Sequence, residues 1–245
     1  MAGEAHVLLC TSTFKRDWQL KESLTLNLPQ TMAWHLRVTW CVFDANPTEE
    51  LWDWARHEFA PLIQGGHLIW LRCAEVPGWE TFHMSVAKTT AHCAGMDASL
   101  ADRCQALVEA GLTADDPEKL ADNTFLVNWD NDGIMCVKWL HEVMRKSSMI
   151  IKGIDKVHPL VGVQWLNSHL GTCGKIGVPW RIFEKVGGYD ESMLAMSCQD
   201  VFSPSCLDRR SAEGVGRPWL HCVQPRGGVG APPHPDGQGQ EEGGL

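Results

Sequence analysis

The sequence predicts an α/β fold built around a mainly parallel sheet. Up to about residue 200, short apolar segments alternate with longer segments of helical periodicity, which is the pattern of strands joined by crossover helices. Several of the short segments carry β-branched and aromatic side chains on both faces, as strands covered by helices on both sides do. A chain of 245 residues is long enough to bury one substantial core.

The expected strands are short and end in polar residues. The first, residues 6–11, is an apolar run followed by small hydroxyl side chains, and the second, RVTWCVF, is apolar on both faces. Gly65-Gly66 breaks the chain before the third, and the fourth, TFLVNW, leads into an acidic turn. The four strands are therefore expected at residues 6–11, 37–43, 67–73 and 124–129, with a further strand at 160–166.

The expected helices lie between these strands. Leucines recur at every fourth position in residues 16–28, and Pro29 is expected to end that helix. The sequence Asn46-Pro47-Thr48-Glu49 has the composition of a helix start, so a helix is expected from there to about Ile63. Further helices are expected at residues 84–96 and 134–145, with an exposed helical insertion at 97–123 and a turn-rich stretch at 171–190.

Composition excludes several classes of protein. The formal net charge of −9 leaves no basic stripe to meet a phosphate backbone, so a nucleic-acid partner is not expected. No window approaches the roughly 18 apolar residues that span a bilayer, and no secretory leader is recognisable, so we expect no membrane segment and a cytoplasmic location. The ten cysteines form no CxxC pair, so neither a zinc site nor a disulfide framework is indicated.

The composition changes after about residue 200. From Pro225 to the end, 11 of 21 residues are glycine or proline, and apolar periodicity is lost. Such a segment buries too little surface to offset the entropy of ordering it. We therefore expect residues 202–245 to be a disordered, low-complexity tail.

Polar residues follow three of the expected strands. Thr11-Ser12-Thr13 follows the first, Asp44 the second, and Asp130 with Asp132 the fourth. Ligands of open α/β sheets bind beyond the carboxyl ends of the strands, so these groups are expected along one edge. Two carboxylates separated by one residue on a turn suit Mg²⁺ or Mn²⁺, which prefer oxygen ligands and bridge well to phosphates.

These segments together resemble a known family. Residues 11–16 (TSTFKR), the strand ending in Asp44, the helix containing Ala87-Lys88 and residues 126–132 (LVNWDND) resemble GT-A glycosyltransferases of the family 2 kind. Downstream, residues 186–191 (VGGYDE) followed by Gln199-Asp200 look like the acceptor-side segment of family 2 and galactosyltransferase-like enzymes. The resemblance covers residues 6–201. It implies a Rossmann-like three-layer GT-A sandwich over residues 1–201, with a nucleotide-sugar-binding half (1–132) and an acceptor-side half (133–201).

The resemblance also implies roles for individual residues. The UDP-type donor would lie against Thr11, Thr13, Arg16, Asp44, Lys88 and Asp130, with Asp44 at the base. Asp130 and Asp132 would hold Mn²⁺ or Mg²⁺, and Asp200 would be the general base that deprotonates a carbohydrate or other hydroxyl acceptor in an inverting transfer. The acceptor side would include Arg181, Gly187, Gly188 and Asp190, although the glycine pair is more simply interpreted as the cap of a short helix.

The sequence departs from the family pattern in two places. Thr89-Thr90 stands where the family carries an asparagine, and Phe202-Ser203-Pro204 follows Asp200 where the family continues into a helix that proline cannot join. The leading hypothesis is transfer of a hexose or N-acetylhexosamine to a hydroxyl. The alternatives are a catalytically impaired or non-catalytic nucleotide-sugar or glycan binder and, third, a nucleotidyltransferase, which would need a Gly-rich basic loop after the first strand.

Overall fold

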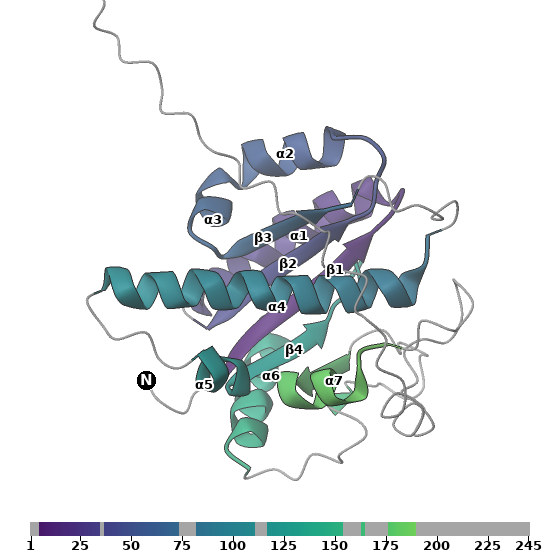
Figure 1. Ribbon diagram of the computed structural model, residues 1–245. Helices are drawn as coiled ribbons and strands as arrows, with labels where there is room; N and C mark the ends of the chain where they lie inside the picture. Colours follow the sequence, from purple (N-terminus) through teal and green to yellow (C-terminus); the bar gives the residue numbers. More distant parts are fainter. Residues whose placement is uncertain are drawn as a thin grey trace, which may run out of the picture.

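One mixed sheet organises the chain (Figure 1). The computed structural model describes residues 5–34, 37–73, 82–110, 117–153, 163–164 and 176–189. Within these ranges the strand order is β3-β2-β1-β4-β6-β5, with β1, β2, β3 and β4 parallel and β6 antiparallel to both of its neighbours. The strands are β1 (His6–Thr13), β2 (Val38–Asp44), β3 (Leu68–Arg72), β4 (Thr124–Asn128), β5 (Val163–Gln164) and β6 (Ile176–Pro179). The predicted α/β class with a mainly parallel sheet is confirmed.

Helices cover both faces of this sheet, which makes a three-layer sandwich. Helices α1 (Asp17–Thr31), α2 (Glu50–Glu58) and α6 (Val137–Ile151) contribute to the core on one face. Helix α4 (Met84–Glu109) crosses the other face, where α7 (Trp180–Val186) also packs (Figure 1). The remaining short elements are η1 (Met32–Trp34), α3 (Ala60–Gln64) and α5 (Pro117–Asp122).

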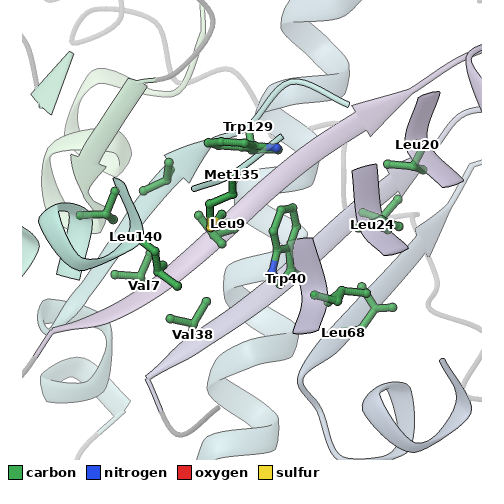
Figure 2. Close-up of a cluster of buried hydrophobic side chains, with 14 of the residues drawn as sticks. Val7, Leu9, Leu20, Leu24, Val38, Trp40, Leu68, Trp129, Met135 and Leu140 are labelled. Atoms are coloured by element: carbon green, nitrogen blue, oxygen red, sulfur yellow. The ribbon is translucent and has the colours of Figure 1, made fainter. Parts of the chain in front are cut away.

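Strand alternation divides the core into two clusters. Successive side chains of a strand point to opposite faces. In β1, Val7 and Leu9 join the cluster under α1 and α6, whereas Leu8 and Cys10 join the cluster under α4. Figure 2 shows the first cluster, in which side chains of α1, β1, β2, β3 and α6 converge with those of the segment after β4. The apolar character of both strand faces, visible in the sequence, therefore reflects burial on both sides.

Helix α1 continues through Pro29, contrary to the expectation that proline would end it. Pro29 removes one backbone hydrogen bond, as a proline does at any position in a helix interior, and only two helical residues follow it. The last turn is held by tertiary contacts: Leu28 and Thr31 are buried, and the Thr31 hydroxyl accepts a hydrogen bond of 3.1 Å from Trp40 Nε1. Burial of the last turn therefore outweighs the local effect of proline.

The helix expected from Asn46 begins later and is divided. Helix α2 begins at Glu50, and α3 follows it after Phe59, whose φ of −120° interrupts the helix. The predicted start of this helix was wrong. The Asn46 side chain bonds to Lys15 and Asp17, and it caps no helix in the described part of the chain. Pro61 explains the division, since its ring clashes with the carbonyl four residues earlier in a continuous helix.

Helix α4 is twice as long as expected and extends to Glu109. Its second half still contacts the sheet, because Ser99 is buried and Arg103 donates a 2.9 Å hydrogen bond to the Thr124 hydroxyl at the start of β4. Much of the expected insertion at 97–123 is thus a continuation of α4, followed by α5. Residues 111–116 lie outside the described ranges.

The stretch at 171–190 contains regular structure that the glycine count obscured. Strand β6 pairs with β4, and α7 follows it directly, burying Trp180 and Phe183. The strand expected at 160–166 contains β5. None of the helices in the described ranges combines the length and apolar composition that crossing a bilayer requires. The expected tail, 202–245, lies outside the described residues.

Candidate active site

A cavity of about 490 Å³ opens at the carboxyl ends of β1 and β4. The segment after β4 supplies Asp130 and Asp132, the β1–α1 connection supplies Arg16, and α4 supplies Lys88. Four of the predicted site residues thus meet in one place. The lining residues within the described ranges are Ser12, Phe14, Arg16, Phe82, Met84, Lys88, Asn128, Trp129, Asp130, Asn131 and Asp132.

The acidic residues of the cavity lie on one tight turn. The Gly133 N–H donates to the Asp130 carbonyl at 2.9 Å, which closes the turn directly after β4. Asp130 is half-buried and Asp132 is exposed, and both line the cavity. Gly133 is required by close approach, since a Cβ there would lie 2.8 Å from the Trp129 ring. The turn therefore presents two carboxylates to the same space.

Two cations line the same cavity as this acidic turn. Arg16 immediately precedes α1 and is exposed, whereas Lys88 is only 4% exposed. The Lys88 ammonium lies 5.5 Å from the centroid of the Tyr189 ring. A site with two carboxylates on one wall and two cations on others suits a ligand that carries both phosphates and a metal ion.

Among the hydroxyl residues of β1, the structure assigns Ser12 to the cavity. By the alternation of β1, Thr11 and Thr13 share the face of Val7 and Leu9, and both threonines are buried there. Thr13 Oγ1 accepts a hydrogen bond of 3.3 Å from Asn131 Nδ2, so it supports the acidic turn and does not line the cavity. The period of two along the strand, applied to the hydroxyl cluster, is the signal that would have indicated Ser12.

Asp44 ends β2 beside Thr13 and is completely buried, so it does not line the cavity. Its Oδ1 accepts hydrogen bonds from the Asn46 backbone N–H (3.0 Å) and side-chain amide (2.9 Å). Its Oδ2 lies 3.8 Å from Arg72 Nε and has no hydrogen-bond partner among the described residues. Burial raises the pKa of Asp44, opposed by the hydrogen bonds from Asn46, by the Arg72 charge and by the Trp70 side chain.

Asn46 connects the β1 and β2 ends of the sheet, a role that the sequence did not suggest. Besides contacting Asp44, its Oδ1 accepts a 2.6 Å hydrogen bond from the Lys15 backbone N–H and its amide donates to Asp17 Oδ1 at 3.0 Å. Lys15 has a φ of +54°, uncommon for a residue with a side chain. Asn46 thereby holds the connection that carries Arg16.

An aromatic pair forms another wall of the cavity. The rings of Phe14 and Phe82 are stacked, with centroids 5.3 Å apart and planes 3° from parallel. Both side chains line the cavity, and they join the β1–α1 connection to the segment that precedes α4. A flat apolar surface beside charged groups suits a ligand with a planar or ring-shaped part.

The described part of the acceptor-side segment lies against α4. Gly187 is the left-handed C-cap of α7, as its helix-capping interpretation predicted. Gly188 follows with a φ of +89°, and the Tyr189 N–H donates to the Thr89 hydroxyl at 3.1 Å. Thr89, one of the departures from the family pattern, therefore anchors this segment one residue from Lys88.

Other predicted residues are not brought to the cavity. Arg181, on α7, forms an exposed ion pair with Asp122, which ends α5 just before β4 starts. That position is at the amino end of β4, whereas the cavity is at its carboxyl end. Asp190 and Asp200 lie outside the described residues.

The donor set of the cavity fits a hard divalent cation shared with a ligand. No group of three or more His, Cys, Asp or Glu side chains arranged to hold an ion occurs in the described ranges. Asp130 and Asp132 nevertheless match the usual protein contribution to a Mg²⁺ site, which is one or two carboxylates completed by phosphate oxygens and water.

A larger concavity of about 670 Å³ lies elsewhere, between η1 and α6. Its walls include Trp34, Arg37, His141 and Arg145. Glu142, the one acid among its described lining residues, pairs with Arg145 at 2.7 Å. The described walls thus offer no pair of carboxylates to hold a metal, so the smaller cavity is the better candidate for chemistry.

Comparisons with known proteins found little similarity in sequence. No protein-family model matches the chain, and no curated protein matches it. Among solved structures, the chain is similar to the mannosyltransferase PcManGT from Pyrobaculum calidifontis in complex with GDP-Man and Mn²⁺, with 14% identity and a TM-score of 0.46. The similarity covers 79% of this chain and 50% of that one, so this chain spans about half of its length. On a similarity of this size, neither the donor nor the metal of that enzyme transfers to this chain.

Proposed function

We propose that this chain is a metal-dependent glycosyltransferase domain that uses a nucleotide-sugar donor. The observation that carries the proposal is the cavity at the carboxyl ends of β1 and β4, which Asp130, Asp132, Arg16 and Lys88 line together. A divalent cation held by the two carboxylates would bind the donor diphosphate and neutralise charge as the bond to the sugar breaks. Arg16 and Lys88 would meet the remaining phosphate charge.

The donor proposed is of the UDP type and carries a hexose or N-acetylhexosamine. Its base would reach Asp44, whose Oδ2 is a buried acceptor without a hydrogen-bond partner in the described part of the chain. Because Asp44 is fully covered, the base gains access only when the groups over it are displaced. A carboxylate accepts hydrogen bonds only, so it favours bases with a ring N–H, which are uracil and guanine, over cytosine and adenine.

The acceptor half of the proposal depends on residues beyond Tyr189. Asp200 would act as general base toward an acceptor hydroxyl in an inverting displacement, a role that typically contributes about 10²–10⁴-fold to the rate. The segment that leads to it is anchored by Thr89 near Lys88. The sequence continues with Pro204 four residues after Asp200, which opposes a supporting helix. Donor binding with weak transfer is therefore the second candidate function.

The central test is metal-dependent donor binding. Titration calorimetry with UDP, UDP-hexoses, UDP-N-acetylhexosamines and GDP-mannose is expected to show binding in Mn²⁺ or Mg²⁺ and little binding in chelator, because the acidic turn repels a bare diphosphate. Asp132→Ala is expected to weaken the metal-dependent affinity more than about tenfold, since loss of even an indirect metal partner typically costs 10–100-fold.

The matched control is Asp53→Ala, which removes an exposed carboxylate of α2 that pairs with Arg56, away from the cavity. This variant is expected to bind as the unmodified chain does. Equal affinity with and without metal would refute the assignment of Asp130 and Asp132, and metal-dependent binding without sugar transfer would favour the second candidate.

A further inference from the structure

The acidic turn rests on two buried polar side chains of α1. Asn27 is 0% exposed; its Nδ2 donates to the Gly133 carbonyl at 2.8 Å, and its Oδ1 accepts from the Met135 N–H at 2.7 Å. One turn earlier in the helix, the Ser23 hydroxyl donates to the Asn131 carbonyl at 2.8 Å, with a longer contact of 3.2 Å to Leu20 O. More than a hundred residues separate these groups from the turn in sequence.

A polar stripe on this face of α1 would be costly without these bonds. Ser23, Asn27 and Thr31 recur every fourth residue beside the core leucines of the same helix, and all three are buried. A buried amide without hydrogen-bond partners destabilises a fold, whereas an apolar side chain there would not. The Asn27 carboxamide finds its partners on the segment that carries the two aspartates.

The turn is held from the side of the sheet as well. The Asn131 side chain, 6% exposed, donates to Thr13 Oγ1 at 3.3 Å, and Trp129 Nε1 donates to the Gly133 carbonyl at 3.2 Å. Asn131, which also lines the cavity, is thereby tied to β1, with Asp130 and Asp132 on either side of it in the sequence. Two like charges this close repel one another, so the backbone needs support to keep both facing one ion.

We propose that Asn27, assisted by Ser23, is a positioning residue that sets the backbone shape of the Asp130–Asp132 turn, and hence the geometry in which the two carboxylates meet a divalent cation. This inference rests on the proposed function for the identity of the ligand. Neither residue is part of the cavity lining, so both act through the carbonyls and the amide of the turn. Groups that orient metal ligands in this way typically change metal affinity 10–100-fold when they are removed.

The test compares three variants of α1. Asn27→Leu removes both bonds to the turn at similar volume, and Ser23→Ala removes one bond and is the milder change. Thr25→Ala is the matched control, because the Thr25 hydroxyl bonds within the helix to Lys21 O and is exposed. Mn²⁺ with UDP is the probe, with affinity measured by calorimetry and the environment of the bound ion by its paramagnetic resonance spectrum.

Asn27→Leu is expected to weaken Mn²⁺-dependent UDP binding at least tenfold and to alter the Mn²⁺ spectrum. Ser23→Ala is expected to do so to a smaller degree, and Thr25→Ala not at all. Hydrogen exchange is expected to accelerate at the Met135 amide and over residues 129–136, while residues 137–151 stay protected. If Asn27→Leu fails to fold, Ser23→Ala gives the same readouts.

A purely structural role would lower the melting temperature of both variants but leave the Mn²⁺–UDP affinity and spectrum unchanged, and that result would overturn the inference. If the unmodified chain binds no Mn²⁺–UDP, the proposed function has failed. The positioning role is then tested by amide hydrogen exchange alone. Faster exchange confined to residues 129–136 would then support it, and exchange that is unchanged or uniformly faster along the chain would reject it.

Discussion

At the scale of single residues, Asp44 combines complete burial with one carboxylate oxygen that no donor in the described ranges satisfies. Asn46 saturates the other oxygen. The Arg72 charge and the Trp70 side chain also stabilise the Asp44 carboxylate, but neither is placed to make a hydrogen bond to Oδ2. A buried acceptor in this state costs free energy in the unbound protein. Under the proposed function, a base that supplies an N–H to Oδ2 would recover that cost, and Asp44 would distinguish one base from another.

Asp44→Asn is expected to weaken UDP binding about tenfold or more while leaving Mn²⁺-pyrophosphate binding nearly unchanged. The substitution keeps Oδ1 as acceptor for Asn46 and replaces the unpaired acceptor by a donor, which repels a ring N–H. Calorimetric titration of both ligands checks this. Equal losses for UDP and pyrophosphate would make Asp44 a phosphate-side or folding residue.

His92 is a second residue whose burial has a measurable consequence. It is stacked on Phe183, and since a carbonyl only accepts, its Nδ1 donates to the Lys88 carbonyl at 2.7 Å. Burial lowers the pKa of His92 from its usual 6.5 to about 4; the hydrogen bond to the Lys88 carbonyl opposes this shift, and the Lys88 charge adds to it. The folded protein therefore keeps His92 neutral at pH values where the unfolded chain protonates it.

We expect the free energy of unfolding to fall as the pH is lowered from 6.5 to about 4. In that window the unfolded chain binds a proton at His92 that the folded chain does not, so stability rises with pH. The loss attributable to His92 is about 3 kcal/mol at the acid end, at about 1.4 kcal/mol per unit of pKa. Urea unfolding of the unmodified chain and His92→Phe across this range measures it, and parallel curves would show that His92 titrates normally.

At the scale of elements, the segment that follows α7 packs closely against α4 at Gly188, where an added side chain would clash. Gly188 has a φ of +89°, and a Cβ there would lie 2.8 Å from Thr89 Cγ2. The same threonine accepts the hydrogen bond from the Tyr189 N–H. The close approach of the two elements therefore depends on the absence of a side chain at Gly188 as well as on its left-handed backbone.

Gly188→Ala is expected to destabilise the fold by more than the roughly 1–2 kcal/mol that a left-handed residue costs by itself. Gly153→Ala is the matched control, because Gly153 also has a positive φ, +67°, but no atom of the described residues lies within 4 Å of its added Cβ. Adding Thr89→Ser to Gly188→Ala removes the clashing methyl and keeps the hydroxyl, so it is expected to restore part of the loss. Equal destabilisation by the two alanines, measured by urea unfolding, would show that the contact with Thr89 has no effect.

At the scale of the whole molecule, the folded body extends at least through α7. Strand β6 pairs with β4, and Trp180, Phe183 and Tyr189 complete the cluster under α4. The segment from Pro225 onward, by contrast, is more than half glycine and proline. The C-terminal boundary of the stable unit is thus expected between these two regions.

A chain ending after Gln224 is expected to melt within a few degrees of the full chain, because the removed residues carry almost no core-forming side chains. A chain ending after Lys175 is the control and is expected to lose cooperative unfolding. It lacks β6 and the buried aromatic side chains of α7, and losing even one such ring typically costs about 3–5 kcal/mol. Thermal unfolding, monitored by circular dichroism, distinguishes the two truncated chains. A large decrease in melting temperature for the chain ending after Gln224 would show that the tail packs against the folded body.

Local sequence determined strands β1 to β4 and the position of the acidic turn, whereas β6 was not predicted. Apolar residues on both faces of β1, β2 and β4 report burial under helices directly, and Asp130 with Asp132 follows a strand whose end is evident from composition. Both features can be predicted from a window of a few residues, because strand composition and strand ends are local patterns. The same local rules were wrong at Pro29 and Asn46, where contacts with distant residues outweighed a helix-ending and a helix-capping preference.

Only the tertiary structure decided which side chains meet at the site and what supports them. Ser12 lines the cavity in place of Thr11 and Thr13 because the sheet places alternate residues on opposite faces. The bonds of Asn27 to Gly133 and Met135 join residues more than a hundred positions apart. The sequence by itself therefore determined the class of fold and the place of the two carboxylates, because these follow from periodicity and strand ends. The tertiary structure decided which hydrogen bonds hold the turn that carries them. Hydrogen bonds between distant residues depend on how the helices pack, and they produce no periodic pattern in the sequence.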